Sequence, residues 1–133
     1  MARFVIDAPT LLHIVTGDVE VNPAHRLVAP NLIRSQALAL LLAAVRDGRI
    51  SEPDALQQHE RLTELKMRLL GDRVSRRTAW KLAREHGWDT TFDAEYLAVC
   101  KLQADALITI DSEMAAKATG VVSVAPIEAL TAG

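Results

Sequence analysis

Short apolar runs alternate along this chain with longer segments that mix apolar and polar residues. Four of the runs predict buried strands, at residues 3–6, 27–29, 106–110 and 121–124. The third, Ala-Leu-Ile-Thr-Ile, ends abruptly at Asp111. Runs of this length that are apolar on both faces are typical of strands in a parallel sheet with layers packed on either side.

The segments between these runs have the composition and the terminal residues of helices. Proline or a capping residue stands at several of the expected starts, and Gly17, Gly48 and Gly87 stand at expected ends. Residues 67–70 either end the third helix or form a further strand. The predicted helices cover residues 9–16, 30–47, a segment that begins at the Ser51 capping box, 75–86 (with Ser75 as the cap), a segment that begins at Thr90 or Thr91, and a short one from Ser112.

Strands that alternate with helices predict an α/β fold, with three layers and a mainly parallel central sheet flanked by helices. The 133 residues are enough for one core, so we expect a single domain over residues 1–133. In the helix at 30–47, the aliphatic residues Leu38, Leu41, Leu42 and Val45 are expected to belong mostly to that core.

Composition narrows the possible environments. Half of the residues are hydrophobic and the longest apolar stretch, 37–45, falls far short of the roughly 20 residues that cross a bilayer. The first residues reach Asp7 after three apolar positions, so we expect no signal peptide. With a single cysteine, Cys100, there is no internal disulfide and no thiolate metal cluster. These features predict a cytoplasmic protein with no membrane partner.

Fifteen basic and seventeen acidic residues give a net charge of −2, so bulk attraction to nucleic acid is absent. Any RNA would have to be attracted by a local basic patch or by a bound cation. The densest basic segment includes Arg73, Arg77, Lys81 and Arg84, which fall near one helix face if the helix begins early. This face either contacts RNA phosphates or, more commonly for such runs, is simply solvated. We expect Trp80 and Trp88 in a core or an interface rather than stacked on bases.

Three aspartates carry the most specific chemical signal. Asp7 and Asp111 each follow a predicted strand, and Asp93 stands at the start of a helix. Ligands bind at the carboxyl edge of parallel sheets, and clustered carboxylates there favour Mg²⁺ or Mn²⁺, which prefer oxygen ligands. Such an ion serves the hydrolysis of phosphodiesters. Helix capping and turn formation explain each aspartate equally simply, and the spacing alone does not choose between the two.

Nearly the whole chain resembles a PIN domain, specifically the small VapC-type ribonucleases that act as toxins in bacterial toxin–antitoxin pairs. The stretches FVIDAPTLL, LVAPNLIRSQALALL and TTFDAEYLAVCKLQADALITID carry the resemblance. It implies Mg²⁺ or Mn²⁺ in an acidic pocket, RNA as the substrate, a homodimer, and an antitoxin protein as the partner. By motif match, Asp7, Asp93 and Asp111 are the implied metal ligands and catalytic residues.

Thr109 matches the family's hydroxyl residue two positions before the last aspartate. Its side chain is expected on the same side as Asp111, where it would hold a water or a carboxylate. Ordinary strand propensity is the alternative explanation for a threonine there.

The chain departs from the family at Gln36, where a glutamate is usual. Glutamine keeps an oxygen acceptor but no charge. Three possibilities follow from this departure. The three aspartates suffice to hold the metal, or Glu95 supplies the missing charge, or the protein has lost nuclease activity and kept only binding. Because Glu95 follows Asp93 by two residues, a regular helix directs the two roughly 200° apart, which favours the first possibility.

We therefore expect a metal-dependent endoribonuclease, the toxin of a type II toxin–antitoxin pair. The alternative is a PIN-like module that binds RNA or protein with impaired or lost cleavage because of Gln36. A phosphatase or receiver-type domain is a weaker third hypothesis, since neither paired aspartates nor a matching lysine is evident.

Overall fold

A five-stranded sheet organises the chain, whose computed structural model describes residues 1–132. Every strand pair is parallel, and the order across the sheet is β3-β2-β1-β4-β5. The elements are β1 (Arg3–Ile6), α1 (Ala8–Thr16), β2 (Arg26–Pro30), α2 (Ile33–Arg46), α3 (Glu52–Glu64), β3 (Arg68–Leu70), α4 (Arg73–His86), α5 (Phe92–Gln103), β4 (Ala106–Ile108), α6 (Ser112–Ala118), β5 (Val124–Ala125) and the 3₁₀ turn η1 (Ile127–Leu130).

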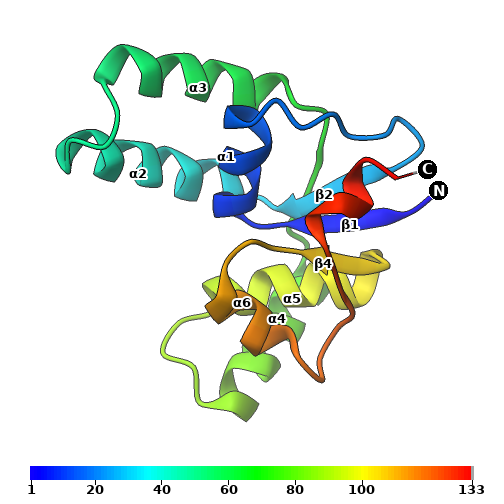
Figure 1. The fold of residues 1–133 in the computed structure, drawn as a ribbon. Helices are drawn as coiled ribbons and strands as arrows, with labels where there is room; N and C mark the ends of the chain where they lie inside the picture. The colour runs from blue at the N-terminus through cyan, green and yellow to red at the C-terminus, as the bar shows by residue number, and fades with distance from the viewer. Residues whose placement is uncertain (133) are drawn as a thin grey trace.

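The helices form one layer on each side of this sheet. Helices α1, α2 and α3 lie on one side, and α4, α5 and α6 lie on the other (Figure 1). The buried apolar side chains form one core cluster, in which Val5, Ile6 and Leu107 are fully buried. The predicted three-layer α/β architecture with a parallel sheet is confirmed. No helix within residues 1–132 has the length and apolar character needed to cross a bilayer.

Several predicted boundaries were wrong, each for a local reason. Asp72 rather than Ser75 caps α4, because its Oδ1 accepts the Ser75 N–H at 2.8 Å, which starts the helix at Arg73. The second helix begins at Ile33 because Pro30 is still paired in the sheet, as the last residue of β2. Of the two alternatives left open for residues 67–70, the strand is confirmed, as β3 over residues 68–70. The last strand is β5 at 124–125 rather than 121–124, and β4 ends at Ile108.

The expected core face of α2 was also partly wrong. Leu41 is buried, but Leu38 and Leu42 are 48% and 68% exposed. A different stripe of this helix faces the core, namely Ile33, Ala37, Leu41 and Ala44. At about 100° per residue, Leu38 and Leu42 are rotated about the helix axis away from that stripe, so they face solvent.

Candidate active site

An open cavity of about 340 Å³ lies where β1 and β4 end. Its walls come from the turns that follow these strands, from the first half of α2 and from the start of α5. Four residues singled out in the sequence line this cavity together: Asp7, Gln36, Asp93 and Asp111. Because the turns after adjacent parallel strands meet at one sheet edge, positions 7 and 111 become neighbours although 104 residues separate them.

Asp7 is the most buried acid of the cavity, with 2% of its surface exposed. One of its oxygens accepts the Thr10 N–H at 3.2 Å and the Thr10 hydroxyl, and the other accepts the Thr109 hydroxyl at 2.6 Å. Burial raises the pKa of Asp7 above its ordinary value, against these hydrogen bonds, and the negative charge of Asp111 acts in the same direction as burial. Negative charge at this position is therefore only partly compensated by the protein.

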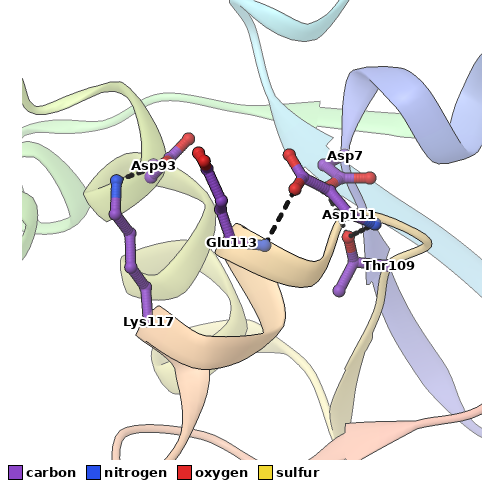
Figure 2. A network of polar contacts seen from close by, with 6 residues as sticks. All are labelled: Asp7, Asp93, Thr109, Asp111, Glu113 and Lys117. Atoms are coloured by element: carbon purple, nitrogen blue, oxygen red, sulfur yellow. Dashed lines mark hydrogen bonds and ion pairs between the residues drawn. The ribbon is translucent and has the colours of Figure 1, made fainter.

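Thr109 joins two of the acids. Its hydroxyl donates to Asp7 and accepts the backbone N–H of Asp111 at 3.0 Å (Figure 2). The expected contact of Thr109 with a carboxylate is confirmed, and the carboxylate is that of Asp7. Thr10 mirrors this arrangement from α1, because its hydroxyl donates to Asp7 and accepts the Ile110 N–H at 3.0 Å. The two hydroxyls fix the Asp7 carboxylate between the ends of β1 and β4.

Asp7 and Asp111 act as helix caps, as the simpler explanation predicts. Asp7 caps α1 through the Thr10 N–H, and Asp111 caps α6 by accepting the Glu113 N–H at 2.9 Å. Capping uses one oxygen of each carboxylate. Both residues still line the cavity. Capping therefore does not remove either side chain from the cavity.

Asp93 lies in the first turn of α5 and is paired with a lysine. Its Oδ2 is 2.7 Å from Lys117 Nζ, and the two side chains are 37% and 34% exposed. The ammonium also lies 5.4 Å from the centre of the Trp88 ring, which stacks on His86. In the view of Figure 2, the carboxylate of Glu113 lies between those of Asp93 and Asp111. The positive charge of Lys117 therefore partly neutralises the acidic side of the cavity.

The three aspartates share a cavity without converging on one point. Within residues 1–132, no three His, Cys, Asp or Glu side chains are grouped closely enough to hold a metal ion as they stand. Pairing of Asp93 with Lys117 contributes to this, because it directs one carboxylate oxygen to an ammonium group. The donors nevertheless have the right chemistry for a hard divalent cation, which carboxylate and amide oxygens bind.

Gln36, on α2, also lines the cavity. Its Oε1 accepts the hydroxyl of Tyr96 at 2.6 Å. Tyr96 is 1% exposed, and burial raises its pKa, as do the negative charges of Asp7, Asp93 and Glu95. The tyrosine therefore stays a neutral donor, and it fixes the amide of Gln36 at the cavity wall.

The remaining candidates lie outside this cavity. Glu95 is not among the residues that line it, as the roughly 200° between positions 93 and 95 on a helix predicts. Arg73, Arg77, Lys81 and Arg84 are exposed on α4. Since α4 begins at Arg73, the condition for a shared basic face is met.

Trp80 is on the same side of α4 and is 62% exposed, so a place in the core was wrong, whereas a place in an interface stays a prediction. Trp88 is partly buried.

Sequence reasoning also missed Thr10, Tyr96, Glu113 and Lys117. For Thr10 and Glu113 the sequence held a signal. Thr10 lies three residues after Asp7 and Glu113 two residues after Asp111, at positions whose backbone N–H a capping aspartate accepts. Lys117 gave no such signal.

Comparison with known proteins adds evidence on the fold. No family model matches the chain, and no curated protein matches it. Among solved structures, the chain is similar to the crystal structure of PAE2754 from Pyrobaculum aerophilum. The TM-score is 0.74 and the sequence identity is 23%. The likeness covers 97% of this chain and 93% of the other. At that identity it shows a shared three-layer α/β fold.

Proposed function

We propose that this protein is a Mg²⁺- or Mn²⁺-dependent endoribonuclease of the PIN type. The observation that carries the proposal is the shared cavity at the carboxyl edge of the sheet, which Asp7, Asp93 and Asp111 all line. Three acids within one small cavity repel one another unless a cation compensates them. Burial raises the pKa of Asp7, and the charge of Asp111 adds to that shift, so a cation beside Asp7 would relieve both.

In this proposal Asp7, Asp93 and Asp111 hold the ion. A bound divalent cation stabilises charge on a phosphoryl group and makes water more acidic, which phosphodiester hydrolysis requires. Thr10 and Thr109 fix the orientation of the Asp7 carboxylate through their hydroxyls. The Lys117–Asp93 pair is one-third exposed, and pairs of that kind contribute about 1 kcal/mol or less. A divalent ion therefore competes with Lys117 for Asp93 at little cost.

The basic face of α4 supports RNA as the substrate. Arg73, Arg77, Lys81 and Arg84 are exposed, and none of them forms an ion pair in the described part of the chain. Exposed Trp80 stands among them. Cations that contact phosphates, beside an aromatic ring that stacks on a base, form a common surface for single-stranded nucleic acid.

The resemblance further suggests that the nuclease acts in the cytoplasm as the toxin of a toxin–antitoxin pair, as a homodimer and with an antitoxin partner. Exposed leucines on α2 and α3 support a protein partner, because Leu38, Leu42 and Leu56 present apolar surface to solvent. A short reading frame for a DNA-binding protein directly upstream of this gene is the genetic arrangement that the proposal expects.

Cleavage of RNA in the presence of Mn²⁺, by the parent and by Asp7→Asn, tests the nuclease. Asparagine is as good an N-cap as aspartate, so the variant keeps α1 and removes one charged ligand. Asp89→Asn is the matched control, since Asp89 is exposed and does not line the cavity. We expect cleavage by the parent and the control, no cleavage by Asp7→Asn, and none in EDTA. Equal cleavage by all three proteins would refute the role of Asp7.

A second candidate function is a PIN-like module that binds RNA or protein without cutting it. Gln36 in place of an acid and the neutralisation of Asp93 by Lys117 favour this function, because both weaken the attraction of the cavity for a cation. Its expected result is RNA binding by the parent with no Mn²⁺-dependent cleavage.

A further inference from the structure

A second and larger cavity, of about 640 Å³, lies at the opposite edge of the sheet. The starts of β1, β2 and β3, the residues before β2 and β3, and the last residue of α5 surround it. Both ends of the described chain lie at this edge (Figure 1). The volume falls within the range of about 300–1,000 Å³ that is usual for small-molecule sites.

Four cations line this cavity. Each of the three adjacent strands begins with an arginine, Arg3, Arg26 and Arg68, and Lys66 precedes the last of them. Arg3 pairs in register with Arg26, and Arg68 pairs with Val28, two residues after Arg26. Since residues aligned in register, and residues two apart on one strand, share a face, all three arginines belong to the same face of the sheet.

These four charges are not neutralised by ion pairs. Among residues 1–132, none of the four cations forms an ion pair, and no aspartate or glutamate is among the residues that line the cavity. All four are exposed. On a protein with a net charge of −2, four unpaired cations around one cavity create a local positive potential.

Most of the rest of the lining is apolar, with His25 and Gln103 as its polar members. Val21, Leu27, Leu65 and Met67 contribute to it. His25 forms part of the wall and is fixed in place, because its ring nitrogens lie 3.3 Å from the Ala2 nitrogen and 2.5 Å from the Ala132 oxygen. Its ring also packs edge-to-face on Phe4. The cavity therefore combines an apolar floor with a cationic rim.

Two features of this edge oppose an anion. The carboxyl end of α5 lies here, and helix carboxyl ends carry a partial negative charge of about half a unit. Asp105 is also close, since its Oδ2 accepts the Arg3 N–H at 2.8 Å. Four full positive charges exceed both contributions, so the balance at the rim stays positive.

We propose that this cavity binds a nucleoside phosphate, with the phosphates on the arginines and the base on the apolar floor. The proposal goes beyond the nuclease activity, because the site lies at the other edge of the sheet and needs no metal. The same chemistry has two sources, a free nucleotide or a segment of single-stranded RNA.

Calorimetric titration of the full chain in EDTA tests the proposal with four probes: ATP, inorganic tripolyphosphate, an octauridylate RNA and an octaglutamate peptide. We expect ATP or the RNA to bind, and Arg26→Glu/Arg68→Glu to weaken that binding about 100-fold, since each arginine contributes a charge-assisted hydrogen bond. Arg46→Glu/Arg49→Glu makes the same change in net charge at exposed positions outside the cavity. That control should change affinity less than about threefold, as expected for a distant charge at moderate salt.

A third variant guards against misfolding of the double variant. Gln103→Glu adds one negative charge to the exposed rim and leaves all four cations in place. It should weaken binding about fivefold, as like-charge repulsion near a surface predicts, without change in the thermal midpoint.

The outcomes separate the sources and the alternatives. Binding of ATP identifies a free nucleotide, and binding of the RNA alone identifies an RNA segment. Three results overturn the proposal: no binding of either probe, binding unaffected by both cavity variants, or tripolyphosphate binding as tightly as ATP, which would mean that the apolar floor is unused. Tighter binding of an octaglutamate peptide than of ATP or RNA would also overturn it. Because EDTA removes divalent ions, none of these results depends on cleavage. RNA bound at the basic face of α4 would be unaffected by the cavity variants, because none of its four cations lines the cavity.

Discussion

Replacement of Thr109 by valine is the sharpest perturbation of the acidic cavity. Valine keeps the shape of threonine but has no hydroxyl, so Asp7 loses the donor at 2.6 Å and the Asp111 N–H loses its acceptor at 3.0 Å. Asp7 is 2% exposed, and water does not readily replace the lost donor. The variant therefore removes hydrogen bonds without leaving a void.

The expected cost follows from the charge on Asp7. A hydrogen bond to a charged group contributes about 1.5–3 kcal/mol, so we take about 2 kcal/mol for Thr109→Val at pH 8. Unfolding entropy of about 2.1 cal/mol/K per residue gives about 0.28 kcal/mol/K for 133 residues. The thermal midpoint should therefore fall by about 7 °C.

The pH dependence of that cost has a definite sign. Burial already raises the folded pKa of Asp7 above its ordinary value of 3.8, and loss of a hydrogen bond that lowers it raises the folded pKa further. The extra destabilisation is then present above the folded pKa and disappears below 3.8, where Asp7 is protonated in both states. At pH 4 the cost should approach the roughly 1 kcal/mol of a neutral hydrogen bond.

Thermal melts at pH 4 and pH 8 of the parent, Thr109→Val, Asp7→Asn and the double variant provide the assay. In the Asp7→Asn background, Thr109→Val should cost about 1 kcal/mol, which leaves a coupling energy of about 1 kcal/mol. Thr119→Val, which removes an exposed hydroxyl bonded to a backbone carbonyl, should cost less than about 0.5 kcal/mol. An identical cost of Thr109→Val at both pH values and in both backgrounds would refute a charged Asp7 held by this hydroxyl.

Three further predictions concern metal and RNA. Gln36→Glu adds a carboxylate to the cavity wall and should tighten Mn²⁺ binding about tenfold by calorimetry; no change would show that position 36 is not part of the site. Lys117→Met releases Asp93 and should tighten Mn²⁺ binding about fivefold, the equivalent of a partly exposed ion pair, whereas weaker binding would make Lys117 a support of the site. Arg77→Ala/Lys81→Ala should reduce the slope of log affinity for single-stranded RNA against log salt by about 1.4, and an unchanged slope would remove the face of α4 from RNA binding.

The edge that holds the acids was predictable from sequence because it depends on local pattern. An apolar run that ends in aspartate marks both a strand and its carboxyl end, as at Asp7 and Asp111. Parallel pairing of β1 with β4 then makes these two turns neighbours. The fold class followed from the same alternation of strands and helices.

What the sequence did not reveal depends on how helices rotate and pack. Lys117 reaches Asp93 because α6 lies beside the start of α5, and no spacing along the chain encodes that contact. Leu38 and Leu42 were misassigned because α2 contains more apolar positions than one buried stripe uses. The cationic cavity likewise depends on register: Arg68 aligns with Val28, and a shift by one residue would place its side chain on the other face of the sheet.

The choice between nuclease and binding module reduces to a competition at Asp93. Lys117 already neutralises this carboxylate, yet the pair is one-third exposed. The Lys117 ammonium also faces the Trp88 ring, which would still attract it after a divalent ion had taken Asp93. Lys117 can therefore leave Asp93 and keep a favourable partner. A lysine held only by Asp93 would resist a divalent ion more strongly. If Mn²⁺ binding in Lys117→Met and in the parent differs by no more than the expected factor of about five, the lysine moderates the site without closing it, and the cavity is able to support catalysis.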